Sequence, residues 1–220
     1  MNVFDIIGPI MIGPSSSHTA GACRIGYYAR KILGEEPMEA TIQFSGSFKD
    51  TYKGHGTDRA VVAGLMGFAV DDVRLKDSMD IAQKEGRKFS IVTEDIDLAH
   101  PNTALIIMKR KNGTTLSVQG ASLGGGNIKI TKLNGVDVSI DGRYDVLLVG
   151  HRDVPGMIHK ITKVLWQNQI NINGLSLHRT EKAGNAVVII EVDEHVRDDV
   201  RDVLLTTDDV TFVTLLHALQ

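Results

Sequence analysis

The sequence is poor in cysteine, and this scarcity excludes several kinds of site. Cys23 is the single cysteine among 220 residues, so the chain can form no internal disulfide. Zinc and iron–sulfur sites built from thiolates need several cysteines, and we therefore expect no metal site of that kind in this chain. Any such cluster would have to be carried by another chain.

The sequence also lacks an excess of basic charge and a long apolar run. With 24 Lys and Arg against 27 Asp and Glu, the formal net charge is −3, which argues against a general nucleic-acid-binding protein. The longest uncharged run, residues 6–23, contains prolines, glycines and serines and is unsuited to a bilayer-spanning helix. The N-terminus shows neither a basic segment nor a signal cleavage site, so we expect a soluble cytoplasmic protein with no membrane anchor.

Glycine is concentrated in the first part of the chain, which indicates two domains. Residues 1–142 contain 18 of the 22 glycines. The turn-like Asp141-Gly142 then precedes a new apolar run. We predict an α+β N-terminal domain of residues 1–142 and a C-terminal domain of residues 143–220, joined without a long linker.

The C-terminal domain has the pattern of a βαββαβ unit. Apolar periodicity predicts strands at residues 146–149, 170–177, 186–192 and 210–216, and helices at residues 158–166 and 196–205. We expect Asp153 to cap the first helix and Pro155 to lie in its first turn. A change of parity at Gly174 predicts a bulge. This order of elements predicts a four-stranded ferredoxin-like sandwich.

The N-terminal domain mixes helices with more numerous strands. The patterns predict helices at residues 19–33, 58–68 and 78–85, and strands at residues 39–44, 89–93, 103–110, 115–118, 128–133 and 136–140. Thr57 is expected to cap the second helix. Asn112-Gly113 is a strong signal for a hairpin between two of the strands.

The segment Gly13–Gly21 is the first of three polar, glycine-rich segments. It places the hydroxyls of Ser15, Ser16, Ser17 and Thr19 and the imidazole of His18 at the start of a helix. Free N–H groups at a helix N-terminus bind anions, so this segment is a candidate anion pocket. The alternative is a solvated capping loop, although a single cap needs only one hydroxyl.

The other two segments are weaker signals. In Ser45–Arg59, Gly54 and Gly56 flank His55, and Thr57-Asp58 starts a helix, so either a ligand-binding imidazole or a capping loop fits. In Gly120–Asn127, three glycines, Gly124, Gly125 and Gly126, form either a flexible corner or a cradle for a phosphate or carboxylate. A turn before a strand fully explains the segment His100–Thr103.

The remaining histidines show no spacing typical of metal ligands. These are His151, His159, His178, His195 and His217, and we expect most of them to be surface or satisfied core residues. His151 differs by its position, because it leads into the turn Asp153–Gly156.

Taken together, the three polar segments resemble a known family. Gly13-Pro-Ser-Ser-Ser-His-Thr19, Gly54-His-Gly-Thr-Asp58 and Ser122-Leu-Gly-Gly-Gly126 are similar to the beta half of iron–sulfur-dependent L-serine dehydratases, in order over roughly residues 1–140. The same fold resembles the allosteric substrate-binding domain of some phosphoglycerate dehydrogenases. The second domain, where Asp153-Val-Pro-Gly-Met157 follows a strand, resembles an ACT domain, which is an amino-acid-sensing module.

The resemblance implies one subunit of an L-serine ammonia-lyase, which converts L-serine to pyruvate and ammonia. A separate alpha subunit would carry the [4Fe–4S] cluster, whose open iron acts as a Lewis acid on the serine hydroxyl. The implied catalytic residues are His18, His55, Ser16, Ser17 and Thr19. The implied substrate-binding residues are Ser15, Ser16, Ser17, Thr57, Asp58, Gly124, Gly125 and Gly126. The residue that removes the α-proton stays open.

The ACT resemblance implies a site for an amino-acid effector. Its residues would be His151, Val154, Pro155, Gly156, Met157 and Asn173. Sheet edges of such sandwiches commonly pair, so we expect at least a homodimer of this chain. The alternative function is a non-catalytic amino-acid-binding regulatory protein. A pyridoxal-phosphate lyase is disfavoured because no lysine lies in a convincing cofactor-binding motif.

Overall fold

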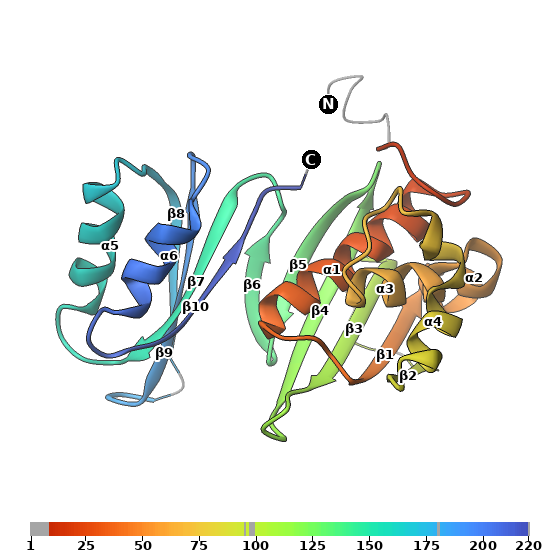
Figure 1. Cartoon of the computed structure of the whole chain (residues 1–220), viewed down its shortest axis with the longest axis horizontal. Coiled ribbons are helices and arrows are strands. Elements are labelled where there is room, and N and C mark those ends of the chain that lie inside the picture. Colours follow the sequence, from red (N-terminus) through yellow and green to blue (C-terminus); the bar gives the residue numbers. More distant parts are fainter. Residues whose placement is uncertain (1–8, 95, 97–99, 180, 220) are drawn as a thin grey trace. The chain divides into compact units, whose positions relative to one another are not determined.

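The computed structural model describes residues 9–94, 96, 100–179 and 181–219. The chain divides into two compact units, Met1–Asp141 and Gly142–Gln220. Each unit combines its own β-sheet with helices, which confirms the predicted α+β class (Figure 1). Within the described ranges, no helix is long and apolar enough to cross a membrane.

A six-stranded mixed sheet forms the frame of the first unit, in the order β2-β1-β3-β4-β5-β6. Its strands are β1 (Glu39–Gly46), β2 (Lys88–Thr93), β3 (Asn102–Lys109), β4 (Thr115–Gly124), β5 (Asn127–Leu133) and β6 (Val136–Ile140). β1 and β2 are parallel, whereas the other neighbours are antiparallel. The tight turn at Asn112-Gly113 joins β3 to β4, as predicted.

The helices of the first unit pack against this sheet and against each other (Figure 1). They are the π-helical turn η2 (Ser16–Gly21), α1 (Ala22–Leu33), α2 (Ser47–His55), α3 (Thr57–Leu65), the 3₁₀ turn η3 (Val73–Asp77) and α4 (Ser78–Lys84). α1 crosses α3 at close range: a Cβ added at Gly26 would lie only 2.2 Å from the Val61 carbonyl oxygen. Only glycine permits such an approach of two helical backbones.

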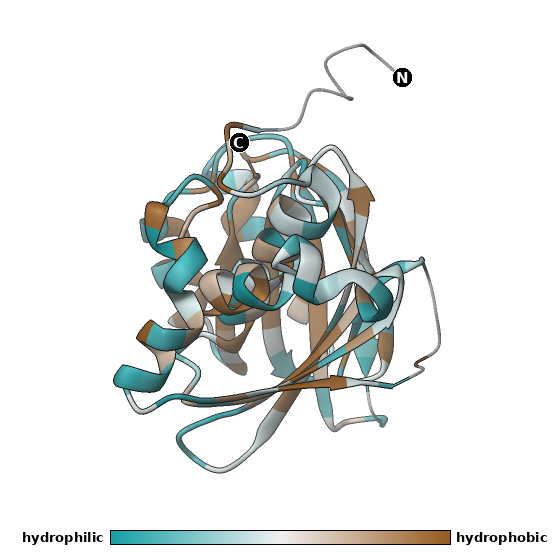
Figure 2. Ribbon diagram, turned by 90° about the vertical axis from the view of Figure 1, so that its right-hand side faces the viewer, coloured by the Kyte–Doolittle hydropathy of each residue, from teal (hydrophilic) through white to brown (hydrophobic). Residues whose placement is uncertain are grey.

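The core of the first unit lies between the sheet and these helices. Burial alternates along β1, where Ala40, Ile42 and Phe44 are buried, as the strand period requires. Ile25 and Tyr28 of α1 are buried as well. Figure 2 shows apolar residues along the strands and polar residues on outward turns of the helices.

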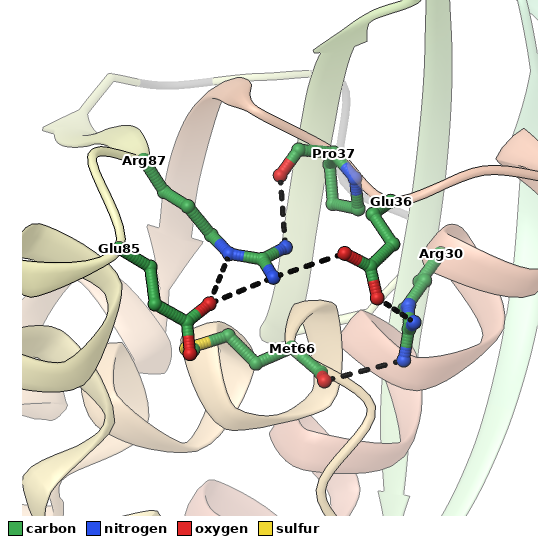
Figure 3. Close-up of polar contacts among 6 residues, drawn as sticks. All are labelled: Arg30, Glu36, Pro37, Met66, Glu85 and Arg87. Carbon is green, nitrogen blue, oxygen red and sulfur yellow. Dashed lines mark hydrogen bonds and ion pairs between the residues drawn. The ribbon is translucent and has the colours of Figure 1, made fainter.

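A polar network stabilises the end of the sheet at which β1 begins (Figure 3). The Arg87 side chain is 8% exposed and forms ion pairs with Glu36 at 3.3 Å and Glu85 at 2.8 Å. Arg30 pairs with Glu36 at 2.8 Å and donates a hydrogen bond to the Met66 carbonyl at 3.2 Å. These contacts tie α1 to the segments that lead into β1 and β2.

The second unit is a four-stranded antiparallel sheet with two helices. Its strands are β7 (Asp145–Arg152), β8 (Ile172–Arg179), β9 (Asn185–Val192) and β10 (Val210–Leu216), in the order β10-β7-β9-β8. The helices α5 (Met157–Gln167) and α6 (Asp198–Leu205) share a core with Leu147, Val149 and Ile190. The predicted βαββαβ order is confirmed, and the register shift between Ile172 and Gly174 confirms the bulge.

Two local predictions in the first unit were wrong. Residues 47–55, expected as part of a loop, form α2. Phe48 and Tyr52, four residues apart, both lie against Phe44, and this helical spacing was the missed signal. Thr57 does not cap α3, because the helix begins at Thr57 after Gly56 and has no side-chain cap.

The predicted start of the first helix in the second unit was also wrong. Asp153 does not cap α5, because its Oδ2 accepts hydrogen bonds from Arg179 and from the Ala183 N–H, each at 3.1 Å. The helix begins only after Gly156, so Pro155 lies in the preceding turn.

Candidate functional site

The segment Ser15–Thr19 forms the start of a helix at the end of the sheet where β1 terminates. Ser15 is the N-cap of η2, and its Oγ accepts the His18 N–H at 3.1 Å. The loop interpretation is therefore correct for one hydroxyl. The backbone N–H groups of Ser16 and Ser17 precede the first helical hydrogen bond, which makes them available to an anion.

His18 contacts side chains from its own segment and from α2. Its Nε2 is 2.9 Å from Ser47 Oγ, its Nδ1 is 3.5 Å from Ser15 Oγ, and its ring meets Phe48 edge-on at 5.3 Å. A neutral ring with the proton on Nε2 satisfies both contacts, donating to Ser47 and accepting from Ser15.

Electrostatics also favour the neutral ring of His18. Burial lowers the pKa of His18, and the neighbouring His55 lowers it further. The two rings lie 4.7 Å apart between centroids. At pH 7 the ring can therefore accept or donate a proton.

His55 and Thr57 each carry a buried polar atom without a hydrogen-bond partner in the described part of the chain. These atoms are His55 Nδ1 and Thr57 Oγ1. Leaving a buried polar group unsatisfied costs about 1–3 kcal/mol, so such groups mark places where a ligand or an ordered water binds. They lie on either side of Gly56, which has a left-handed backbone with φ 64°.

Thr19 has a different environment from the other hydroxyls of its segment. Its side chain is buried, and Oγ1 donates to the His55 carbonyl oxygen at 3.0 Å. Thr19 therefore joins η2 to the end of α2, and its hydroxyl proton is already used. The contact fixes the orientation of the Thr19 side chain, and a catalytic role of Thr19 stays a prediction.

The glycines of Gly124–Gly126 form the tight turn between β4 and β5, with Gly124 paired to Asn127. All three have positive φ, and a Cβ at Gly124 would lie 3.7 Å from Ser17 Oγ. Ser122 Oγ donates to the Ser17 carbonyl at 2.9 Å. The turn therefore lies beside Ser17.

The structure also brings in residues that sequence reasoning missed. Ser47 contacts His18, and its N–H donates to the Pro101 carbonyl at 2.8 Å. Asn102 Nδ2 donates to the Ser122 carbonyl at 3.4 Å. The segment His100–Thr103 was dismissed as a simple turn, yet register pairs Asn102 with Gly46 at the site. Arg24 Nη1 also reaches the carbonyl of Gly126 at 3.0 Å.

Asp58, expected to bind substrate, lies in the first turn of α3. Its Oδ1 accepts the Arg59 N–H at 2.8 Å. This contact is local to the helix start, so the structure links Asp58 to the site only through its position beside Thr57.

In the second unit, the turn before α5 lies next to a buried histidine. His151 is 2% exposed, and its Nδ1 lies 2.7 Å from the Arg152 carbonyl oxygen. Its Nε2 is buried with no partner among the described residues. Val154, Pro155 and Gly156 are exposed, whereas Met157 is buried as the first residue of α5.

Asn173 lies far from His151 in the same chain, so the expectation that both contribute to one effector site within a chain was wrong. His151 pairs with Ala186, which pairs with Arg179 at one end of β8. Asn173 lies in the bulge near Ile172, which pairs with Val192 at the other end. About six residues of strand separate the two ends, or roughly 20 Å.

Comparison with known proteins identifies the first unit. A family model described as "Serine dehydratase beta chain" matches residues 2–112, and a model of the ACT domain matches residues 146–207. The chain belongs to the serine dehydratase beta chain family. It is 43% identical over 213 residues to the "Probable L-serine dehydratase, beta chain" of Bacillus subtilis, covering 97% of this chain and 96% of that protein.

The chain is also similar to two further proteins. The L-serine dehydratase beta chain of Peptoniphilus asaccharolyticus is 35% identical, with coverage of 96% of this chain and 95% of that one. The D-3-phosphoglycerate dehydrogenase of Bacillus subtilis is 22% identical over 89% of this chain and 37% of its own length. The resemblances to serine dehydratase beta chains and to an ACT domain are thus confirmed.

The residues of this beta chain do not fit an iron–sulfur cluster. Cys23 is buried on α1, where its Sγ donates to the Phe68 carbonyl at 3.5 Å. Burial raises the pKa of the Cys23 thiol to about 12, so it stays protonated at neutral pH. A cluster of four irons is held by several thiolates, and the sequence has only this one cysteine.

Proposed function

We propose that this beta chain forms, together with a separate alpha chain, a cytoplasmic two-chain L-serine dehydratase, which converts L-serine to pyruvate and ammonia. A separate alpha chain would carry the [4Fe–4S] cluster and supply Lewis-acid chemistry at the serine hydroxyl. The observation that carries the proposal is the neutral His18 at a helix N-terminus, beside unsatisfied polar atoms of His55 and Thr57. The family relationship supports the choice of substrate.

In this proposal, the start of η2 binds the carboxylate of L-serine. The N–H groups and hydroxyls of Ser16 and Ser17 face an anion there, and the positive end of the helix dipole favours negative charge. The glycine turn Gly124–Gly126 lies close to Ser17. A substrate held by these groups is oriented and shielded from water, both of which lower the barrier.

His18 would handle a proton of the substrate. Its contacts with Ser47 and Ser15 fix the ring orientation, and its lowered pKa keeps the ring neutral. A positioned imidazole typically contributes 10²–10⁴-fold to rate. His55, whose Nδ1 has no hydrogen-bond partner among the residues that the structure describes, would bind a second polar group of the substrate.

The test is turnover of the complex reconstituted with the alpha chain under anaerobic conditions. His18→Ala should lower pyruvate formation by at least about 100-fold while complex formation and cluster content stay unchanged. His159→Ala is the matched control, because His159 lies exposed on α5, and it should change turnover by less than about threefold. Small and equal effects from the two variants would refute the role of His18.

A regulatory role of the ACT domain, residues 143–220, accompanies this function, whereas residues 1–142 would carry the catalytic contribution. The unsatisfied Nε2 of His151, next to the turn Val154–Met157, supports binding of an amino-acid effector there. The strands β8 and β10 are the edges of the sheet, which supports pairing into a homodimer. A strict monomer at micromolar concentration would contradict the homodimer.

The alternative is a regulatory protein that binds an amino acid without catalysis. Calorimetry with L-serine on the isolated chain separates the two functions when it is combined with the reconstitution assay. Serine binding without any turnover on addition of the alpha chain would favour the regulatory protein.

A further inference from the structure

Three side chains that are far apart in the sequence converge where neighbouring strands of the ACT sheet begin or end. Asp145 begins β7, His195 lies between β9 and α6, and His217 directly follows β10. The sheet order explains the convergence, because β7 is the neighbour of both β9 and β10. Asp145 pairs with Val192, the last residue of β9, and the next residue of β7 pairs with Leu216, the last of β10.

The two imidazoles share one carboxylate oxygen. Nδ1 of His217 lies 2.9 Å from Asp145 Oδ2, and Nδ1 of His195 lies 3.2 Å from the same oxygen. The rings stack with centroids 4.5 Å apart and an interplanar angle of 28°. One nitrogen from each histidine and one oxygen of Asp145 all lie within 4.8 Å of one another.

The carboxylate is held in place independently of the histidines. Asp145 is 5% exposed, and it accepts the Val196 N–H at 2.9 Å and the Ala218 N–H at 2.8 Å. Hydrogen bonds of this kind orient a ligating carboxylate in metal sites. The His195 and His217 side chains, in contrast, are 72% and 45% exposed, so solvent reaches the imidazoles.

From this geometry we infer that Asp145, His195 and His217 form a binding site for a first-row divalent metal ion such as Zn²⁺. Two donors on a tetrahedral Zn²⁺ lie about 3.3 Å apart, given metal–ligand bonds of about 2.0–2.2 Å. The two distances between Asp145 Oδ2 and the imidazole nitrogens are already close to this value. The ion would replace the hydrogens between the nitrogens and the oxygen, and the exposed side leaves positions for water.

The ligand types restrict the ion. Two imidazoles and one carboxylate suit Zn²⁺, Co²⁺, Ni²⁺ or Fe²⁺, whereas Mg²⁺ and Ca²⁺ prefer oxygen ligands. Sequence spacing could not reveal the site, because the three residues are brought together only by the pairing of strands. The inferred site holds no cysteine, so it is distinct in chemistry from an iron–sulfur centre.

The test is Zn²⁺ binding to the full-length untagged chain, measured by competition with a chromophoric chelator. Co²⁺ added in place of Zn²⁺ reports the ligand geometry by its visible absorbance. We expect one ion per chain with micromolar or tighter affinity, and at least about tenfold weaker binding in His195→Ala and in His217→Ala.

His159→Ala and His178→Ala are the matched controls and should leave the affinity unchanged. Circular dichroism of each variant checks that the fold is retained, and Asp145 is left intact because it anchors two backbone N–H groups. The double variant His195→Ala/His217→Ala keeps His18 and His55, so it also reports any binding at those residues. No saturable binding by the wild-type chain at about 100 μM Zn²⁺, or unchanged binding by the double variant, would overturn the inference.

Discussion

The contact between Gly21 and Ser122 offers a sharp test of how the site is built. Gly21 is the last residue of η2, and a Cβ added there would lie 2.1 Å from Ser122 Oγ and 2.7 Å from Ser122 Cβ. Ser122 is fully buried and its Oγ donates to the Ser17 carbonyl. Neither side can move freely, so Gly21→Ala must push η2 away from β4.

The size of the effect follows from two losses. Overpacking of a tight contact costs about 1–3 kcal/mol, and breaking the hydrogen bond from Ser122 to Ser17 costs about 1 kcal/mol. We therefore expect Gly21→Ala to lower the unfolding free energy of the first unit by roughly 2–4 kcal/mol. Turnover of the reconstituted enzyme should fall as well, because η2 carries Ser17 and His18.

A second substitution separates this steric argument from a general loss of stability. Ser122→Gly removes both atoms that the new Cβ would meet, and alone it should cost about 1–2 kcal/mol. The double variant Gly21→Ala/Ser122→Gly should be only slightly less stable than Ser122→Gly, with a favourable coupling energy of at least about 1 kcal/mol. Thermal unfolding of the wild type, the two single variants and the double variant measures this double-mutant cycle. Stability losses that simply add, or a melting temperature of Gly21→Ala within about 1 °C of the wild type, would refute the reasoning.

Three further outcomes are expected. Cys23→Ala should cost about 1–2 kcal/mol of stability and retain activity, since the thiol is a buried packing group. Loss of activity in a variant that still folds would contradict this. In the wild-type chain, Cys23 should not react with a thiol reagent until the chain unfolds. The pKa of His18 is lowered in the folded chain, so below about pH 6.5 the unfolded chain binds more protons than the folded chain, and stability should fall as the pH decreases through that range. His18→Asn should remove this part of the pH dependence of the melting temperature. A pH profile identical to that of the wild type would contradict the expectation. Gly156 has φ 89° with open space around the position of a Cβ, so Gly156→Asn should keep the fold and the effector response. Gly156→Val should lose the effector response and keep basal turnover. Loss of both the response and basal turnover in Gly156→Val would indicate that Gly156 is needed for folding.

The polar segments around the site could be recognised in the sequence, but the role of each side chain within them could not. Ser15, Ser16, Ser17 and Thr19 all carry hydroxyls, yet the structure makes Ser15 a cap and buries Thr19 against His55. Each use depends on a neighbour from another element. Local composition cannot distinguish these roles, because the neighbour is chosen by packing.

The sequence by itself determined the fold class of the protein and the order of the elements in its second unit. Apolar periods of two and 3.6 residues are local properties, so they predicted the βαββαβ unit, the hairpin at Asn112-Gly113 and the bulge at Gly174. A single cysteine also argued against an iron–sulfur cluster in this chain without any structure.

Only the tertiary structure decided which distant residues meet. Strand register places Asn102 beside Gly46, and it separates Asn173 from His151. Packing of η2 against α2 places Ser47 beside His18. Strand register also unites Asp145 with two histidines that showed no common spacing. A sheet aligns residues through hydrogen bonds between strands whose order along the chain and order in space differ, so the positions of these groups follow from pairing and burial over the whole unit.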